Sequence, residues 1–88
     1  MEKTWIVYIL RCKDDTLYTG ITDDLARRMA AHNSGKGAKY TRGRGPVEVV
    51  YTEVLESYSA ALKREAAIKR LKRQEKEQLI QATEYPKP

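Results

Sequence analysis

Six consecutive residues, Trp5 to Leu10, are aromatic, β-branched or leucine, and this run constrains the fold of the 88-residue chain most. A strand with one face in water alternates apolar and polar residues, whereas an unbroken apolar run is typical of a strand covered on both faces. The run therefore predicts the central strand of a small sheet. It stops at Arg11 and is too short for a signal-peptide core or a membrane span.

A hairpin is predicted after this strand, because residues 13–15 favour a turn and the next residues favour an antiparallel return. With a three-residue loop, Tyr8 lies opposite Gly20. Tyr18 then faces Leu10, and both phenols lie on one face of the sheet, whereas a slip by one residue would separate them. A tyrosine in a strand usually serves packing, so a role for either phenol depends on that shared face.

The stretch Leu17–Asn33 is predicted to be a short strand that ends at Gly20 and runs directly into a helix. Thr22 or Asp23 is expected to cap that helix by accepting its free N–H groups. This corner carries a tyrosine, an arginine and a histidine on one rigid unit.

The helical phase, at about 100° per residue, separates the polar side chains of this segment. Leu25, Met29 and His32 share the inward stripe, while Arg27 points to solvent. Arg28 lies at the margin of the stripe, one turn from His32. Taken singly, His32 is a semi-buried structural histidine and Arg28 covers apolar surface with its stem. Their joint occurrence after Tyr-Thr-Gly favours a functional site.

The net charge of +5, from 17 Lys and Arg against 12 Asp and Glu, suggests an anionic partner. Residues 34–46 hold four glycines, four basic residues and no acid, which favours a phosphate-contacting loop over a solvated linker. Residues 63–76 hold seven basic residues and two glutamates, which favours a cationic helix face for nucleic acid. The predicted nucleic-acid-binding residues are Lys36, Lys39, Tyr40, Arg42, Arg44, Lys69, Lys72 and Arg73.

The segment Val47–Leu55 is predicted to be the third strand, with the glutamates Glu48, Glu53 and Glu56 in solvent. A helix should follow, with Ser57 as its N-cap. Its apolar stripe is expected to comprise Tyr58, Ala61, Ile68 and Leu71.

Glu65 falls inside this apolar stripe, where a carboxylate must be hydrogen-bonded, paired with a cation or bound to a metal. Its sequence neighbours Lys63 and Arg64 point elsewhere. A structural ion pair with Arg28 is the alternative to a metal site. The helical pattern continues to Leu79 without a break that the residues themselves reveal.

The length predicts one domain over residues 1–82, with residues 83–88 as a frayed tail. Cys12 is the only cysteine, which excludes an intramolecular disulfide and a cysteine-based zinc site. A cytoplasmic location without membrane association fits this composition best.

The ordered set of Ile6-Val7-Tyr8, Tyr18-Thr19-Gly20, Arg28, His32 and a helical glutamate resembles the GIY-YIG nuclease domain. The likeness covers roughly residues 4–80 and is greatest to small stand-alone bacterial members. The Gly-Arg-Gly-Pro stretch and residues 60–65 are also similar to the catalytic domain of branched-DNA structure-specific endonucleases. Ile6 replaces the glycine of the first signature, and Ile21 stands where some members have a polar or basic residue.

The resemblance implies an α+β fold, with a three-stranded antiparallel sheet flanked by helices and a helix break near residues 72–74. It also implies phosphodiester hydrolysis with one divalent ion, Mg²⁺ or Mn²⁺, bound by Glu65. Tyr8 would orient or deprotonate the attacking water, and Arg28 would hold the phosphate. By motif position, the family's catalytic residues correspond to Tyr8, Tyr18, Arg28, His32 and Glu65.

Three hypotheses follow for the function. The first is a metal-dependent nuclease acting on structured or single-stranded DNA, as a monomer or weak dimer and with a possible targeting protein. The second is a non-catalytic nucleic-acid-binding module that retains the fold. The third is an RNA-associated accessory protein, although DNA is favoured over RNA as the partner.

Overall fold

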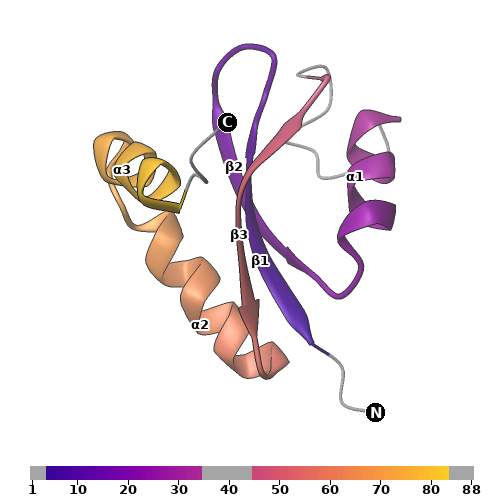
Figure 1. Ribbon diagram of the computed structural model, residues 1–88, viewed down its shortest axis with the longest axis vertical. Coiled ribbons are helices and arrows are strands. Elements are labelled where there is room, and N and C mark those ends of the chain that lie inside the picture. Colours follow the sequence, from indigo (N-terminus) through magenta and orange to yellow (C-terminus); the bar gives the residue numbers. More distant parts are fainter. Residues whose placement is uncertain (1–3, 35–44, 84–88) are drawn as a thin grey trace.

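The sheet has three antiparallel strands in the order β2-β1-β3, so the apolar run found in the sequence is the central strand. The computed structural model describes residues 4–34 and 45–83 (Figure 1). Its elements are β1 (Trp5–Arg11), β2 (Leu17–Thr22), α1 (Leu25–Asn33), β3 (Glu48–Leu55), α2 (Tyr58–Lys69) and α3 (Arg73–Thr83). Helix α1 lies on one side of the sheet, and α2 and α3 lie on the other. The predicted α+β fold is confirmed.

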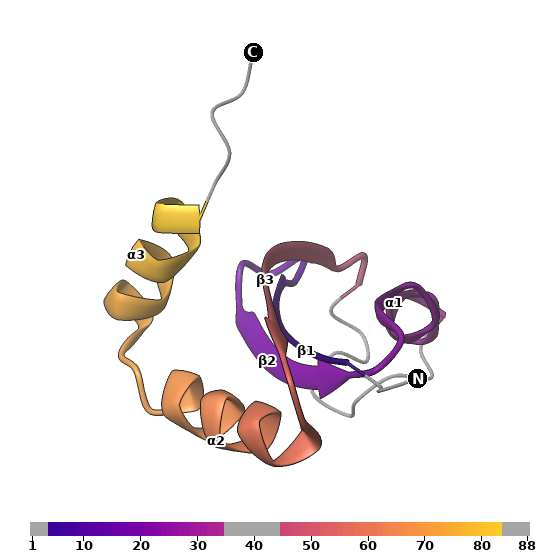
Figure 2. The same cartoon turned by 60° about the horizontal axis from the view of Figure 1, so that its bottom comes forward.

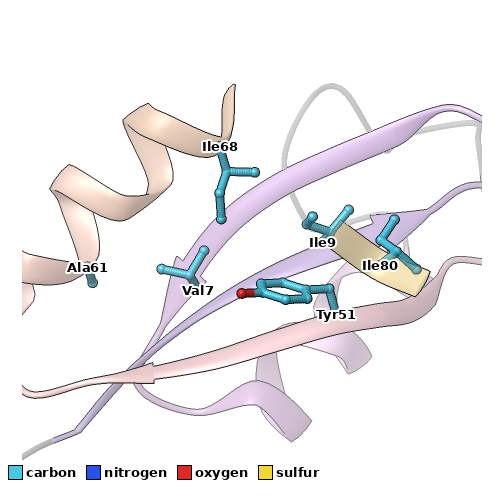
Figure 3. Close-up of a cluster of buried hydrophobic side chains, with 6 residues drawn as sticks. All are labelled: Val7, Ile9, Tyr51, Ala61, Ile68 and Ile80. Atoms are coloured by element: carbon cyan, nitrogen blue, oxygen red, sulfur yellow. The ribbon is translucent and has the colours of Figure 1, made fainter. Parts of the chain in front are cut away.

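Strand β1 is buried on both faces, as the unbroken apolar run predicted. Its alternate residues Val7 and Ile9 enter a core with Tyr51 of β3 and the apolar side chains of α2 and α3 (Figure 3). Tyr8 and Leu10 enter a second core on the opposite side, where Leu25 and Met29 of α1 pack against it. Residues Val7 to Leu10 are each at most 1% exposed.

The predicted hairpin register is confirmed. Tyr8 pairs with Gly20, and Leu10 pairs with Tyr18. The Cys12 N–H donates to the carbonyl of Thr16 at 2.8 Å, which closes the three-residue loop. Both phenols therefore lie on the face of the sheet that α1 covers.

Two details of the corner between β2 and α1 differ from the prediction. The strand does not end at Gly20 but continues to Thr22, because the glycine is accommodated in mid-strand. The N-cap is Asp24, whose carboxylate accepts the Arg27 N–H at 3.1 Å. Thr22 instead bonds the backbone of Asp24, both accepting from its N–H and donating to its carbonyl. The hydroxyl two residues before the N-cap thus stabilises the capping residue rather than the helix.

Ser57 caps α2 as predicted, accepting the Ala60 N–H at 3.1 Å. Ala61 and Ile68 are fully buried, but Tyr58 was wrongly placed in the inward stripe, since it is 51% exposed. The helix ends at Lys69, which confirms the break that the family resemblance implied.

The break between α2 and α3 is stabilised by a cap that the sequence analysis missed. A Glu75 carboxylate oxygen accepts the Lys72 N–H at 2.9 Å, and the Lys72 carbonyl accepts the Lys76 N–H at 3.0 Å. A glutamate three residues after the capping position is half of a capping box. The signal was therefore present in the spacing of Lys72 and Glu75.

The expectation that all three glutamates around β3 are solvated is wrong for Glu53. Its carboxylate accepts a hydrogen bond from Nε of Arg64 at 2.6 Å, and both side chains are about one-third exposed. The pair links β3 to α2. Glu48 and Glu56 are exposed as expected.

A network of four charges joins the β1–β2 hairpin to the start of α3. Arg11 donates two hydrogen bonds to the Glu77 carboxylate, at 2.6 and 3.0 Å, and a third to Asp15. Arg73 contacts the same two carboxylates. Hydrogen bonding from Arg11 is the main reason that the pKa of Glu77 falls to about 2.

None of the helices within residues 4–34 and 45–83 has the length and apolarity to cross a bilayer.

We predict that Glu77→Gln lowers the free energy of unfolding at pH 7 by about 1 kcal/mol, because a paired, bidentate carboxylate is lost. A carboxylate with a depressed folded-state pKa stabilises the fold above its unfolded pKa and loses that contribution as pH falls toward the folded value of about 2. The difference between parent and variant should therefore shrink below about pH 4.5. Urea denaturation of both proteins at about ten pH values between pH 7 and pH 2.5 measures this difference in the free energy of unfolding. A constant difference would contradict the assignment.

Candidate active site

Three side chains from β1, β2 and α1 form an aromatic cluster on the α1 side of the sheet. The ring centroids lie 6.4 Å apart for Tyr8 and Tyr18, and 5.5 Å apart for Tyr18 and His32. The Tyr8 hydroxyl oxygen is 3.2 Å from Nε2 of His32, at hydrogen-bond distance. The hairpin register and the helical phase together bring these groups to one place.

Arg28 adds a positive charge to this cluster. It is one turn from His32 on α1, and interaction with the Tyr8 hydroxyl and, to a smaller extent, with that of Tyr18 raises its pKa. Arg27, the neighbouring arginine, points to solvent with 77% of its side chain exposed, as the helical phase predicted. The cluster therefore contains one permanent cation that interacts with two phenols.

Burial sets the protonation of the two interior groups. Tyr8 is 1% exposed, and burial raises its pKa even though the contact with Arg28 lowers it. His32 is 2% exposed, and burial, with a smaller contribution from the charge of Arg28, lowers its pKa. At neutral pH the first is therefore a neutral phenol and the second a neutral imidazole. Tyr18 and Arg28 are only partly buried and form the outer part of the cluster.

Gly20 lies directly beneath the Tyr8 phenol in the β1–β2 pair. A Cβ at this position would lie 2.6 Å from the Tyr8 hydroxyl oxygen and 2.8 Å from Cζ. It would also lie 3.0 Å from the Tyr18 ring. Only a residue without a side chain leaves room for both rings, and this requirement, which the sequence analysis did not identify, explains a glycine in mid-strand.

Glu65 approaches the cluster from α2, on the other side of the sheet. Its side chain is 18% exposed and forms an ion pair with Lys69 at 3.5 Å. The ion pair that the structure shows for Glu65 is with Lys69 on its own helix, rather than the bridge to Arg28 that was the alternative. The Glu65 charge contributes to the raised pKa of Tyr8, so the carboxylate acts electrostatically on the cluster.

Comparison with known proteins identifies this arrangement. A model of the GIY-YIG catalytic domain matches residues 4–78. The chain belongs to the GIY-YIG family. GIY-YIG domains form a nuclease superfamily that generally uses divalent metal ions, which points to a nucleic-acid partner.

Several similar proteins are named UPF0213. The chain is 58% identical over 74 residues to the UPF0213 protein of Natronomonas pharaonis, covering 84% of this chain and 87% of the relative. It is 51% identical over 84 residues to that of Oceanobacillus iheyensis, covering 96% and 98%. The solution structure of the Bacillus halodurans UPF0213 protein matches with a TM-score of 0.62 at 49% identity, covering 94% of this chain and 88% of that one. These names state no activity or substrate.

The donor set around Glu65 restricts the metal that this GIY-YIG domain could hold. Among residues 4–34 and 45–83 there is no group of three or more His, Cys, Asp or Glu side chains placed to bind an ion. Zn²⁺ prefers such a group, whereas Mg²⁺ is commonly held by one carboxylate, waters and substrate phosphate oxygens. The single carboxylate of Glu65 therefore fits a hard ion that retains water.

Two of the predicted nucleic-acid-binding cations already have carboxylate partners. Lys69 pairs with Glu65, and Arg73 belongs to the network with Glu77. Lys72 is exposed at the break between α2 and α3. The five predicted residues of the basic loop, Lys36, Lys39, Tyr40, Arg42 and Arg44, lie outside the described residues. The i,i+4 spacing of Glu65 and Lys69 was a sequence signal for their pair.

We predict that Gly20→Ala destabilises the protein by about 1–3 kcal/mol, because the new methyl group overpacks against the Tyr8 ring. Gly45→Ala is the matched control, since a Cβ at that position meets nothing within 4 Å. Urea denaturation of both variants measures the difference. Equal stability of the two variants would contradict the packing role of Gly20.

We predict that acid destabilises the protein through His32. Because burial lowers its folded-state pKa, the unfolded chain binds more protons below about pH 6.5, and stability falls as pH drops through this range. His32→Gln should lose this pH dependence. Thermal melts of parent and variant at pH 5 and pH 7.5, values on either side of the ordinary histidine pKa, test it. Parallel loss of Tm in both proteins would contradict the role of His32.

Proposed function

We propose that this protein is a metal-dependent endonuclease that hydrolyses phosphodiester bonds in DNA. The observation that carries the proposal is the Tyr8 hydroxyl, which lies 3.2 Å from Nε2 of a neutral His32. The Arg28 cation interacts with the same hydroxyl and raises its own pKa by doing so. A phenol between a cation and a proton acceptor can relay a proton without ionising fully. The GIY-YIG family membership supports the same reaction.

Arg28 is proposed to bind the phosphate. Its guanidinium is planar and permanently charged, which suits the recognition of two phosphoryl oxygens. In the free protein it interacts with the Tyr8 hydroxyl, which raises the pKa of Arg28. A phosphate that draws the guanidinium toward itself would uncover this hydroxyl, which is otherwise buried, for the attacking water. Substrate binding and exposure of the proton acceptor are then coupled.

The proposed proton route runs from the water through Tyr8 to His32. The water proton moves to the Tyr8 oxygen, and the phenolic proton moves to Nε2 of His32, whose own ring proton is on Nδ1. The water oxygen forms a bond to phosphorus, the bond to the leaving sugar oxygen breaks, and that oxygen takes a proton from solvent. Tyr18, at the outer side of the cluster, orients the water.

Glu65 is proposed to hold one Mg²⁺ or Mn²⁺. The ion, when bound, neutralises the charge that develops on the phosphoryl oxygens and on the leaving oxygen. Lys69 holds the carboxylate in place before the ion arrives, through their 3.5 Å ion pair. Three exposed cations among residues 63–76 supply long-range attraction for the DNA backbone: Lys63, Arg70 and Lys72.

We predict that Glu65→Gln reduces cleavage of a labelled DNA flap or single strand in Mg²⁺ or Mn²⁺ by about 100-fold or more, because the amide is a poor ligand for a hard ion. Arg28→Ala should have a similar effect. The thermal stability of both variants should stay close to that of the parent. Chelation by EDTA should abolish cleavage by the parent.

Glu56→Gln, which removes an exposed carboxylate at the turn before α2, is the matched control and should cleave like the parent. Cleavage by Glu65→Gln at the parental rate would show that the assigned metal ligand is wrong. If the parent binds DNA in a salt-sensitive manner but yields no product with any divalent ion, the protein is a binding module. Cleavage or tighter binding of RNA of equal length would overturn DNA as the substrate.

A further inference from the structure

An aromatic pair, one ring half-buried against the core and the other exposed, lies at the start of α2. The rings of Trp5 and Tyr58 are in contact, with centroids 4.8 Å apart and planes tilted by 57°. Tyr58 is 51% exposed, and Leu62, one turn further along α2, is 40% exposed. Together they place apolar and aromatic surface in water, although Tyr58 was expected in the core. An exposed patch of this kind marks a surface for a partner.

The patch continues along one flank of α2 to Glu65. With the buried Ala61 facing the sheet at 0°, a rotation of about 100° per residue places Tyr58, Leu62, Glu65 and Lys69 between about 40° and 100°. Arg64 lies on the opposite flank, where it pairs with Glu53 of β3. The four residues therefore form a row that faces away from β3. Tyr58 and Glu65 are separated by about 10 Å along the helix axis.

The charge beside this row favours a polyanion. The row ends at Lys69, and residues 63–76 carry seven basic side chains against two acids. Figure 2 shows α2 running beneath the sheet toward α3, so the helix that begins at the aromatic pair leads into the break between α2 and α3. Lys72 is exposed at that break. An aromatic surface followed by cations is how proteins bind single strands, with bases stacked on rings and phosphates near the charges.

We propose that Trp5, Tyr58 and Leu62 form a stacking platform for an unpaired base of a single-stranded segment, beside the phosphate at Glu65. The position of that phosphate rests on the proposed function. A base inside a duplex has both faces covered by its neighbours and cannot use the platform. The platform thus selects single strands and flaps over continuous duplex.

Binding can be tested without catalysis, because Trp5 is the only tryptophan in the chain. Titration of the full chain with oligo-dT in EDTA should quench its fluorescence as a base stacks on the pair. A blunt duplex of equal charge should quench it much less. Equal quenching by the two ligands would overturn the platform.

Tyr58→Ala should weaken binding of oligo-dT by about 5- to 100-fold, which is the range for loss of one stacked base. The same variant should leave duplex binding within about twofold of the parent, since duplex binding depends on phosphate contacts. Tyr58→Phe should bind oligo-dT like the parent. Fluorescence anisotropy with labelled ligands, preceded by circular dichroism to verify folding, measures these constants.

Val54→Ala is the matched control, because Val54 is 66% exposed but pairs with Ile6 and so points to the other face of the sheet. Parental affinity of Tyr58→Ala for oligo-dT would overturn the proposal. So would a parent that sediments as a dimer and dissociates in Tyr58→Ala, since the patch would then bind a second copy. Cleavage that depends on Glu65 but not on Tyr58 would leave the nuclease intact and remove the platform. Quenching by oligo-dT without any cleavage would support the platform and contradict the proposed nuclease activity.

Discussion

The contact between the Tyr8 phenol and the backbone of Gly20 is the constraint on which the rest of the site depends. It requires a glycine in the middle of β2, at the register position opposite Tyr8. The phenol fills the space that a side chain would occupy and reaches His32 of α1. If β2 slipped by one residue against β1, Tyr18 would turn to the other face of the sheet and a residue with a side chain would replace Gly20 opposite Tyr8. The hydrogen bond between Tyr8 and His32 thus depends on both the register of the sheet and the position of α1.

Burial and charge have opposite effects in this cluster, and their balance sets its chemistry. Burial raises the pKa of Tyr8 and lowers that of His32, so both lack charge at neutral pH. Arg28 keeps its charge because it lies at the outer side and bonds with the phenols. The interior can accept and pass a proton while the exterior can bind an anion. On α2 the same balance operates between Glu65 and Lys69, where one cation stabilises a carboxylate that is only 18% exposed.

Much of the fold could be predicted from the sequence because the relevant signals are local. The apolar run identified β1, turn residues identified the hairpin, and the 100° phase of α1 separated Arg27 from Arg28. The failures occurred where a second element decides the outcome. The sequence pattern predicted a solvated Glu53, but in the structure its carboxylate is paired with Arg64 of α2. Tyr58 fits the apolar stripe of α2, yet the core beneath that end of the helix is closed by Ala61, and the ring packs on Trp5.

The sequence by itself determined which residues can line the site, because strand alternation and helical phase follow from the backbone alone. It also determined the family. No single triplet is specific for that family, but the ordered set of residues is. Only the tertiary structure decided how these groups are charged and which cations have partners. Protonation depends on the surroundings that other elements supply, and ion pairs such as Arg11 with Glu77 join residues 66 positions apart. Linear spacing carries no information about such contacts, since they arise only when separate elements pack together.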